Sequence, residues 1–157
     1  MQQQGYKPDR GPHLVAALLC ESVLTETDGV KSLIRIIDWI VGTGQGPDAP
    51  DSMPPMAWQG ILFLAFKADE ARGPVPIRIT ITMPSGLEEP KPVYEGTIHF
   101  EGGTRGHNLQ AQLRLGLKEA GPYWFNVYVG EYRVARTPLE VIYTVNKGPA
   151  QPPRPPA

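Results

Sequence analysis

The chain has 157 residues, of which 41% are hydrophobic and 20% charged, and its formal charge at pH 7 is -1. These values are typical of one globular domain with a core, and the scattered Lys and Arg residues do not form the basic surface that nucleic-acid binding needs. The single cysteine, Cys20, cannot form an internal disulfide, which favours a reducing, cytoplasmic compartment. No apolar run approaches the roughly 20 residues of a transmembrane helix, so we expect no membrane partner.

The first predicted element is the apolar segment His13–Leu24, which follows a polar stretch, residues 1–12, predicted to be a flexible arm. Basic residues ahead of this short apolar run mimic a signal peptide, but the apolar pattern continues past Cys20. We therefore interpret the run as part of the fold. Asp28–Gly29 is a hairpin signal, and it leads to the isoleucine-rich segment Leu33–Val41.

Helix is a rival interpretation for these two segments, because the apolar residues also fit helical spacing. The β-branched isoleucines and the Asp-Gly turn favour strands. Gly42–Pro55 is rich in Gly and Pro, which predicts a loop, and Trp58–Ala68 is apolar on both faces, which predicts a central strand. The sequence "ARGPVP" then predicts a turn.

The rest of the chain shows the alternation of apolar and polar residues that is typical of half-buried strands. Thr137–Pro138 is expected to interrupt the pairing of the last two strands. A turn is expected at Glu101–Asn108, a two-residue hairpin turn at Gly130–Glu131, and a Pro-rich disordered tail at residues 147–157. The predicted strands are Val75–Met83, Val93–Phe100, Leu109–Leu117, Tyr123–Val129, Tyr132–Arg136 and Leu139–Val145.

Short strands at near-regular spacing with no convincing helix predict an all-β fold. The expected architecture is an antiparallel two-sheet sandwich over residues 13–146, with about eight or nine strands.

The pattern Leu-x-Glu-x-Gly-x-Tyr, formed by Leu117, Glu119, Gly121 and Tyr123, resembles the tyrosine corner of immunoglobulin-like and fibronectin-like domains. The resemblance implies that the Tyr123 hydroxyl returns to the backbone a few residues upstream. It also implies that these four residues are structural and that the sandwich is an immunoglobulin-like one without a disulfide.

The stretch "ALLCESVLTETDGVKSLIRIIDWI", together with "YWFNVYVGEYRVARTPLEVIY", is similar to a family of small uncharacterised bacterial proteins. In that family a Cys-Glu strand, an Asp-Gly turn and a Ser-Leu-Ile-Arg-Ile-x-Asp strand open a β-sandwich. The resemblance implies a fold and a bacterial origin, but no activity.

Cys20 is the one candidate nucleophile, and a catalytic cysteine needs a base within hydrogen-bond reach. No histidine lies in a recognisable nucleophile context, so we predict that Cys20 is a buried core residue. Glu21 and Arg35 fall on neighbouring rungs of the predicted hairpin, which favours a cross-strand ion pair over a metal site.

The glycine-rich run Gly42–Gly46 follows a strand, but the prolines after it forbid the helix that a phosphate site needs. His99 and His107 flank the predicted glycine turn, and two histidines without a third ligand make a weak zinc site. Surface polar roles are therefore expected for both, and no cofactor or metal is expected.

With no convincing catalytic set, the sequence favours a non-catalytic protein-binding or adaptor module. The predicted contact surface consists of the Gly42–Pro55 loop, the Glu101–Asn108 turn, and Trp58 at the edge of the first of these segments. Its candidate residues are Trp58, Gln45, Asp48, Arg105 and His107. The alternatives are a structural subunit of a larger, virion-associated or self-assembling structure, and a hydrolase that uses Cys20.

Overall fold

The computed structural model describes residues 6–149, which form seven strands and no helix. Residues 1–5 and 150–157, which include parts of the predicted arm and tail, lie outside the described residues. The strands are β1 (His13–Thr25), β2 (Lys31–Ile36), β3 (Trp39–Gln45), β4 (Met56–Thr82), β5 (Tyr94–Leu117), β6 (Gly121–Val129) and β7 (Tyr132–Asn146).

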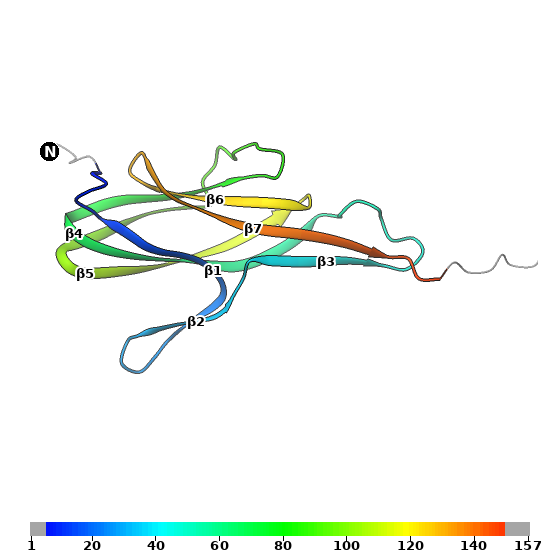
Figure 1. Cartoon of the computed structure of the whole chain (residues 1–157), viewed down its shortest axis with the longest axis horizontal. Helices are drawn as coiled ribbons and strands as arrows, with labels where there is room; N and C mark the ends of the chain where they lie inside the picture. The colour runs from blue at the N-terminus through cyan, green and yellow to red at the C-terminus, as the bar shows by residue number, and fades with distance from the viewer. Residues whose placement is uncertain (1–5, 150–157) are drawn as a thin grey trace, which may run out of the picture.

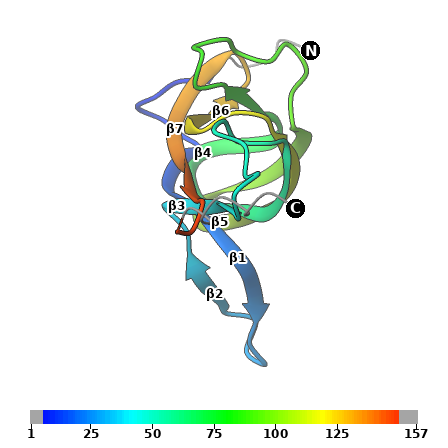
Figure 2. The ribbon, with the colours of Figure 1, turned by 90° about the vertical axis from the view of Figure 1, so that its right-hand side faces the viewer.

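All seven strands belong to one hydrogen-bonded sheet, in the order β2-β1-β4-β6-β7-β3, with β5 paired to β4. The sheet curls into a half-barrel, as Figure 1 and the perpendicular view in Figure 2 show. The all-β prediction is confirmed. The prediction of a two-sheet immunoglobulin-like or fibronectin-like sandwich with eight or nine strands is wrong, because the strands form one continuous sheet.

The curl comes from one long antiparallel hairpin, β4–β5, whose pairing runs from Met56 opposite Leu117 to Ile79 opposite Tyr94. The first part of β4 also pairs with β1, and its last part pairs with β6, so one strand contributes to both sides of the half-barrel. Between these parts the register shifts twice around Asp69. Irregular pairing of this kind bends a hairpin, which lets the two sides face each other.

The predicted turns "ARGPVP" and Glu101–Asn108 are therefore wrong, since β4 and β5 run through them. Proline in β4 is tolerated for a local reason. The Pro76 oxygen accepts from Gly130, so the Pro76 nitrogen also points toward β6, where pairing begins only at Ile77. A missing N–H costs nothing where no strand lies opposite.

The predicted break at Thr137–Pro138 is also wrong, because β7 is continuous through these residues. The Glu140 N–H donates to Asp38, so alternate residues of β7, Pro138 included, point their backbone groups toward β3. Pairing with β3 starts only at Glu140, so the Pro138 nitrogen has no opposite strand to bond.

The predicted strand Leu33–Val41 is divided between two strands, because the chain changes partner after Ile36. The Ile37 N–H donates to the Leu19 oxygen of β1 at 2.8 Å, and the Asp38 oxygen accepts from Glu140 of β7 at 3.0 Å. β3 then runs parallel to β7 up to Gln45, so the first residues of the predicted Gly42–Pro55 loop form a strand. The β2–β3 segment thereby connects β1 to β7.

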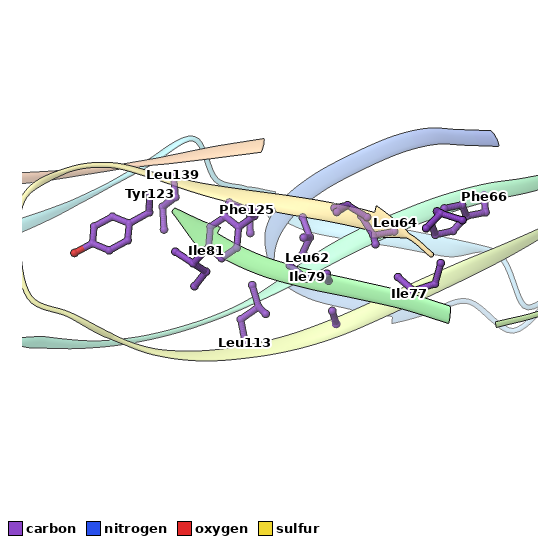
Figure 3. Packing of buried hydrophobic residues seen from close by; sticks show 14 of the residues in the cluster. Leu62, Leu64, Phe66, Ile77, Ile79, Ile81, Leu113, Tyr123, Phe125 and Leu139 are labelled. Atoms are coloured by element: carbon purple, nitrogen blue, oxygen red, sulfur yellow. The ribbon is translucent and has the colours of Figure 1, made fainter. Parts of the chain in front are cut away.

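The core lies inside the curl, where alternate side chains of β4, β5, β6 and β7 meet (Figure 3). Members that are at most 1% exposed include Leu62, Leu64, Ile77, Ile79, Phe125 and Leu139. Complete burial of each such side chain stabilises the fold by about 1.5–3 kcal/mol.

The predicted tyrosine corner is present although the surrounding fold is not a sandwich. The Tyr123 hydroxyl donates to the Glu119 oxygen at 2.8 Å and accepts from the Glu119 N–H at 3.2 Å. Gly121 has a φ of 122°, and a Cβ at this position would lie 2.9 Å from the Pro84 side chain. Tyr123 and Leu117 are each 1% exposed. The corner therefore closes the β5–β6 connection as a local motif.

The described part of the N-terminal segment packs against the body of the protein. The Tyr6 ring lies 5.4 Å from the Tyr132 ring, Gly11 and Pro12 are buried, and the Arg10 oxygen accepts from the Glu70 N–H. Among residues 6–149 there is no helix long and apolar enough to span a membrane.

Candidate functional site

Trp58, predicted to be a binding residue at a loop edge, lies in the core and is 9% exposed. Its indole covers the backbone of Gly60, where a Cβ would approach two ring carbons to 2.5 Å, and its ring centroid lies 6.5 Å from that of Phe125. A side chain packed in this way offers almost no surface to a partner.

Arg105 and His107 lie on β5 at the bend of the long hairpin, beside a surface cavity of about 290 Å3. His99, Glu101 and Arg105 also line the cavity. The Arg105 guanidinium contacts the Glu101 carboxylate at 2.5 Å, so these two charges neutralise each other. The cavity is a polar hollow with little net charge.

The wall of this cavity carries two imidazoles, one carboxylate and one guanidinium. Within residues 6–149 no three metal-ligating side chains are close enough to hold an ion. His99 and His107 line the same hollow, and the nearby His13 pairs with Asp69 at 2.7 Å rather than with a nucleophile. The prediction of surface polar roles for His99 and His107 agrees with this arrangement.

The end of β3 and the loop that follows it lie at the opposite end of the molecule from the β4–β5 bend (Figure 1). Gln45 is the exposed last residue of β3, and Asp48 is exposed in the loop that follows. The loop is fixed to the sheet, since the Tyr143 hydroxyl donates to the Pro50 oxygen at 2.8 Å and Lys147 pairs with Asp51 at 2.7 Å. The pKa of the Asp51 carboxyl is lowered because it accepts a hydrogen bond from Lys147. The five predicted binding residues therefore do not form one surface.

Cys20 is completely buried and has a free thiol, as predicted. Burial raises the pKa of this thiol, which opposes formation of the reactive thiolate. The predicted ion pair between Glu21 and Arg35 is confirmed at 2.7 Å, and both side chains are largely exposed. Neither feature points to catalysis.

The surfaces that the sequence did not reveal are the open edges of β2 and β3, the strands at the two ends of the strand order in the described sheet. Figure 2 shows the β1–β2 hairpin projecting from the body. Within the described chain β2 pairs only with β1, and β3 only with β7. The apolar side chains exposed along this segment are Ile34 (38%), Ile36 (55%), Trp39 (60%) and Val41 (54%).

The backbone of β3 presents regular hydrogen-bonding groups to this open side. The Asp38 oxygen and the Gly46 N–H both bond to β7, so even-numbered residues point their backbone groups inward. In a strand the two polar groups of one residue point the same way and alternate along the chain. The N–H and C=O groups of Val41 and Thr43 therefore face the open edge.

β3 lacks the features that normally protect an edge strand. Edge strands are commonly blunted by charged residues, proline or a bulge. Trp39–Gln45 contains neither a charged residue nor a proline, and its register with β7 is regular. Two carboxylates lie at its beginning, where Asp38 precedes Trp39 and Glu140 is its β7 neighbour.

On the face of the sheet that points away from the core, two arginines stack on aromatic rings. Arg78 of β4 lies 4.5 Å from the Tyr128 ring centroid, and Arg136 of β7 lies 4.4 Å from that of Trp124. These are the cations found over aromatic rings within residues 6–149, so Trp39 carries none.

No protein-family model matches the chain, and the curated proteins contain no significant match to it. The resemblance to the uncharacterised bacterial family therefore stays a prediction.

Proposed function

We propose that the protein is a non-catalytic protein-binding module whose contact surface is the open β3 edge. A partner would add an extended segment beside β3, so that its backbone bonds to the edge-facing groups of Val41 and Thr43. The observation that carries this proposal is an uncharged strand that pairs only with β7 among the described residues and that carries the exposed side chains of Trp39 and Val41. Strand addition of this kind gives affinity through main-chain hydrogen bonds and specificity through alternate side chains.

The proposal includes a reducing compartment, which the one free cysteine supports. The hydrolase alternative has no support, because Cys20 is buried and its raised pKa disfavours the thiolate.

A selection from a displayed library of random short peptides tests the proposal. We expect enriched peptides to bind the wild-type protein and not Thr43→Pro. This substitution removes an N–H donor that faces the open edge, but it removes no hydrogen bond to β7. The variant should therefore fold normally, which circular dichroism and the melting temperature will check. In amide exchange, an added peptide should protect Val41 and Thr43. Equal binding by Thr43→Pro would contradict the proposal.

A structural subunit is the second candidate, favoured by the presence of a further open edge on β5 in the described chain. The outer side of β5 is also without a strand partner in the described chain. Pairing of this edge with β3 of another copy would build an open assembly. Light scattering distinguishes the candidates, since a binding module stays monomeric at micromolar concentration, whereas a structural subunit forms larger species that Thr43→Pro disperses.

A further inference from the structure

We infer that the segment added beside β3 belongs to another protein and carries an arginine opposite Trp39, with a β-branched apolar residue two positions away. This inference rests on the proposed function and names the chemistry of the partner. Its basis is the charge of the β3 edge together with the way this sheet uses arginine elsewhere.

The sheet covers its outward aromatic rings with arginines from adjacent strands. Tyr128 and Trp124 both lie on β6, and their arginines come from β4 and β7, one on each side. Arg78 is the direct cross-strand neighbour of Tyr128. Trp39 lies on the edge strand of the same outer face, so only an added strand can supply the equivalent cation. An arginine over a tryptophan face contributes about 0.5–1 kcal/mol at an exposed site.

The charges around Trp39 also favour a basic partner. Glu140 is beside Trp39 on β7, Asp38 precedes it, and both are exposed. Neither the stretch 38–45 nor the stretch 138–146 contains a lysine or an arginine. A guanidinium opposite Trp39 would therefore meet an aromatic face and two carboxylates with no competing cation from these strands.

The positions that follow Trp39 define the rest of the partner segment. Val41 has Ile142 beside it, and Thr43 has Thr144, whose hydroxyl oxygen is 3.3 Å from its own. Cross-strand pairs favour like with like, so the added strand should place Val or Ile opposite Val41 and Thr or Ser opposite Thr43. In antiparallel pairing, the more stable arrangement, its sequence reads Thr/Ser-x-Val/Ile-x-Arg.

The test uses the peptides enriched in the displayed random library, synthesised and measured by fluorescence polarisation. We expect an arginine at a fixed position, two residues after a β-branched residue. Replacing this arginine with glutamine should weaken binding about five- to tenfold, and the affinity should fall as salt is added. Trp39→Ala should weaken binding of the original peptide by a similar factor, and Glu140→Gln about two- to threefold.

The matched control is Leu87→Ala, which removes another exposed apolar side chain, 65% accessible, from the β4–β5 loop and should leave the affinity unchanged. Enriched peptides that need the β3 edge but carry no basic residue would overturn the inference and leave the proposed function standing. Arginine peptides that bind Trp39→Ala as well as wild type would also overturn it. So would self-association of the wild type that Thr43→Pro abolishes, since a second copy would then be the occupant. If no peptide depends on the edge, both proposals fail.

Discussion

Replacing Tyr123 with phenylalanine removes the one hydroxyl that closes the corner between β5 and β6. That oxygen makes two hydrogen bonds to Glu119, at 2.8 Å to its carbonyl and 3.2 Å from its N–H. Each neutral bond contributes about 0.5–1.5 kcal/mol net. Tyr123→Phe keeps the buried ring, so we expect a loss of about 1–3 kcal/mol in the free energy of unfolding.

Urea denaturation followed by circular dichroism measures this loss as a lower midpoint at unchanged slope. In a domain of this size, a loss of about 2 kcal/mol corresponds to a fall of about 4–8 °C in the melting temperature. Tyr143→Phe is the matched control, because its hydroxyl makes a single bond, to the exposed Pro50 oxygen, and water can replace that bond. We expect this control to lose less than about 1 kcal/mol.

The reasoning is refuted if Tyr123→Phe unfolds at the wild-type urea concentration. It is equally refuted if Tyr143→Phe loses as much stability, because the effect would then come from any tyrosine hydroxyl and not from the corner.

Three further predictions concern the packing and the charges. Cys20 should react with a thiol reagent only after unfolding. Because burial raises the pKa of this thiol, its contribution to the free energy of unfolding is complete below the ordinary thiol pKa and declines as the pH rises above that value. Cys20→Ala should remove this decline from urea denaturation curves measured across the pH range. Gly60→Ala should displace the Trp58 indole, lower stability by about 1–3 kcal/mol and shift tryptophan emission to the red; unchanged emission would contradict the packing. A double-mutant cycle on Glu21 and Arg35 should give at most about 1 kcal/mol, falling with salt, because both side chains are exposed.

Local features were predictable from the sequence because each depends on residues that are close along the chain. The turn at Asp28–Gly29 forms, with the Asp28 carboxylate accepting from the Val30 N–H at 3.0 Å. The two-residue turn at Gly130–Glu131 also forms, with Gly130 at a φ of 58°. The Tyr123 corner and the burial of Cys20 were likewise predicted.

The architecture was not predictable because it depends on which strand lies opposite each proline. The sequence "ARGPVP" was interpreted as a turn and Thr137–Pro138 as a break, yet the nitrogens of Pro76 and Pro138 point toward stretches where no strand pairs. Merging the strands on either side of such prolines turns a sandwich of short strands into one curled sheet. Nothing in the local pattern of Val75–Met83 or Leu139–Val145 distinguishes the two outcomes.

The contact surface was missed for a related reason. Trp58 was predicted to be a contact residue at a loop edge, whereas the structure buries it and exposes Trp39, which lies inside the predicted strand Leu33–Val41. The change of partner at Ile37 decides this, because it places β3 at the margin of the sheet. An uncharged run without proline, "WIVGTGQ", was the available signal of an unprotected edge.

The parallel pairing of β3 with β7 joins parts of the chain that are far apart in sequence, such as Thr43 and Thr144. Contacts of such long span close a large loop and form late, after local hairpins have assembled. Within this strand, the amides of Val41 and Thr43, which face the open side, should exchange with solvent sooner than those bonded to β7. A segment bound to this margin would make bonds that only the folded protein offers, so it would raise the free energy of unfolding by mass action.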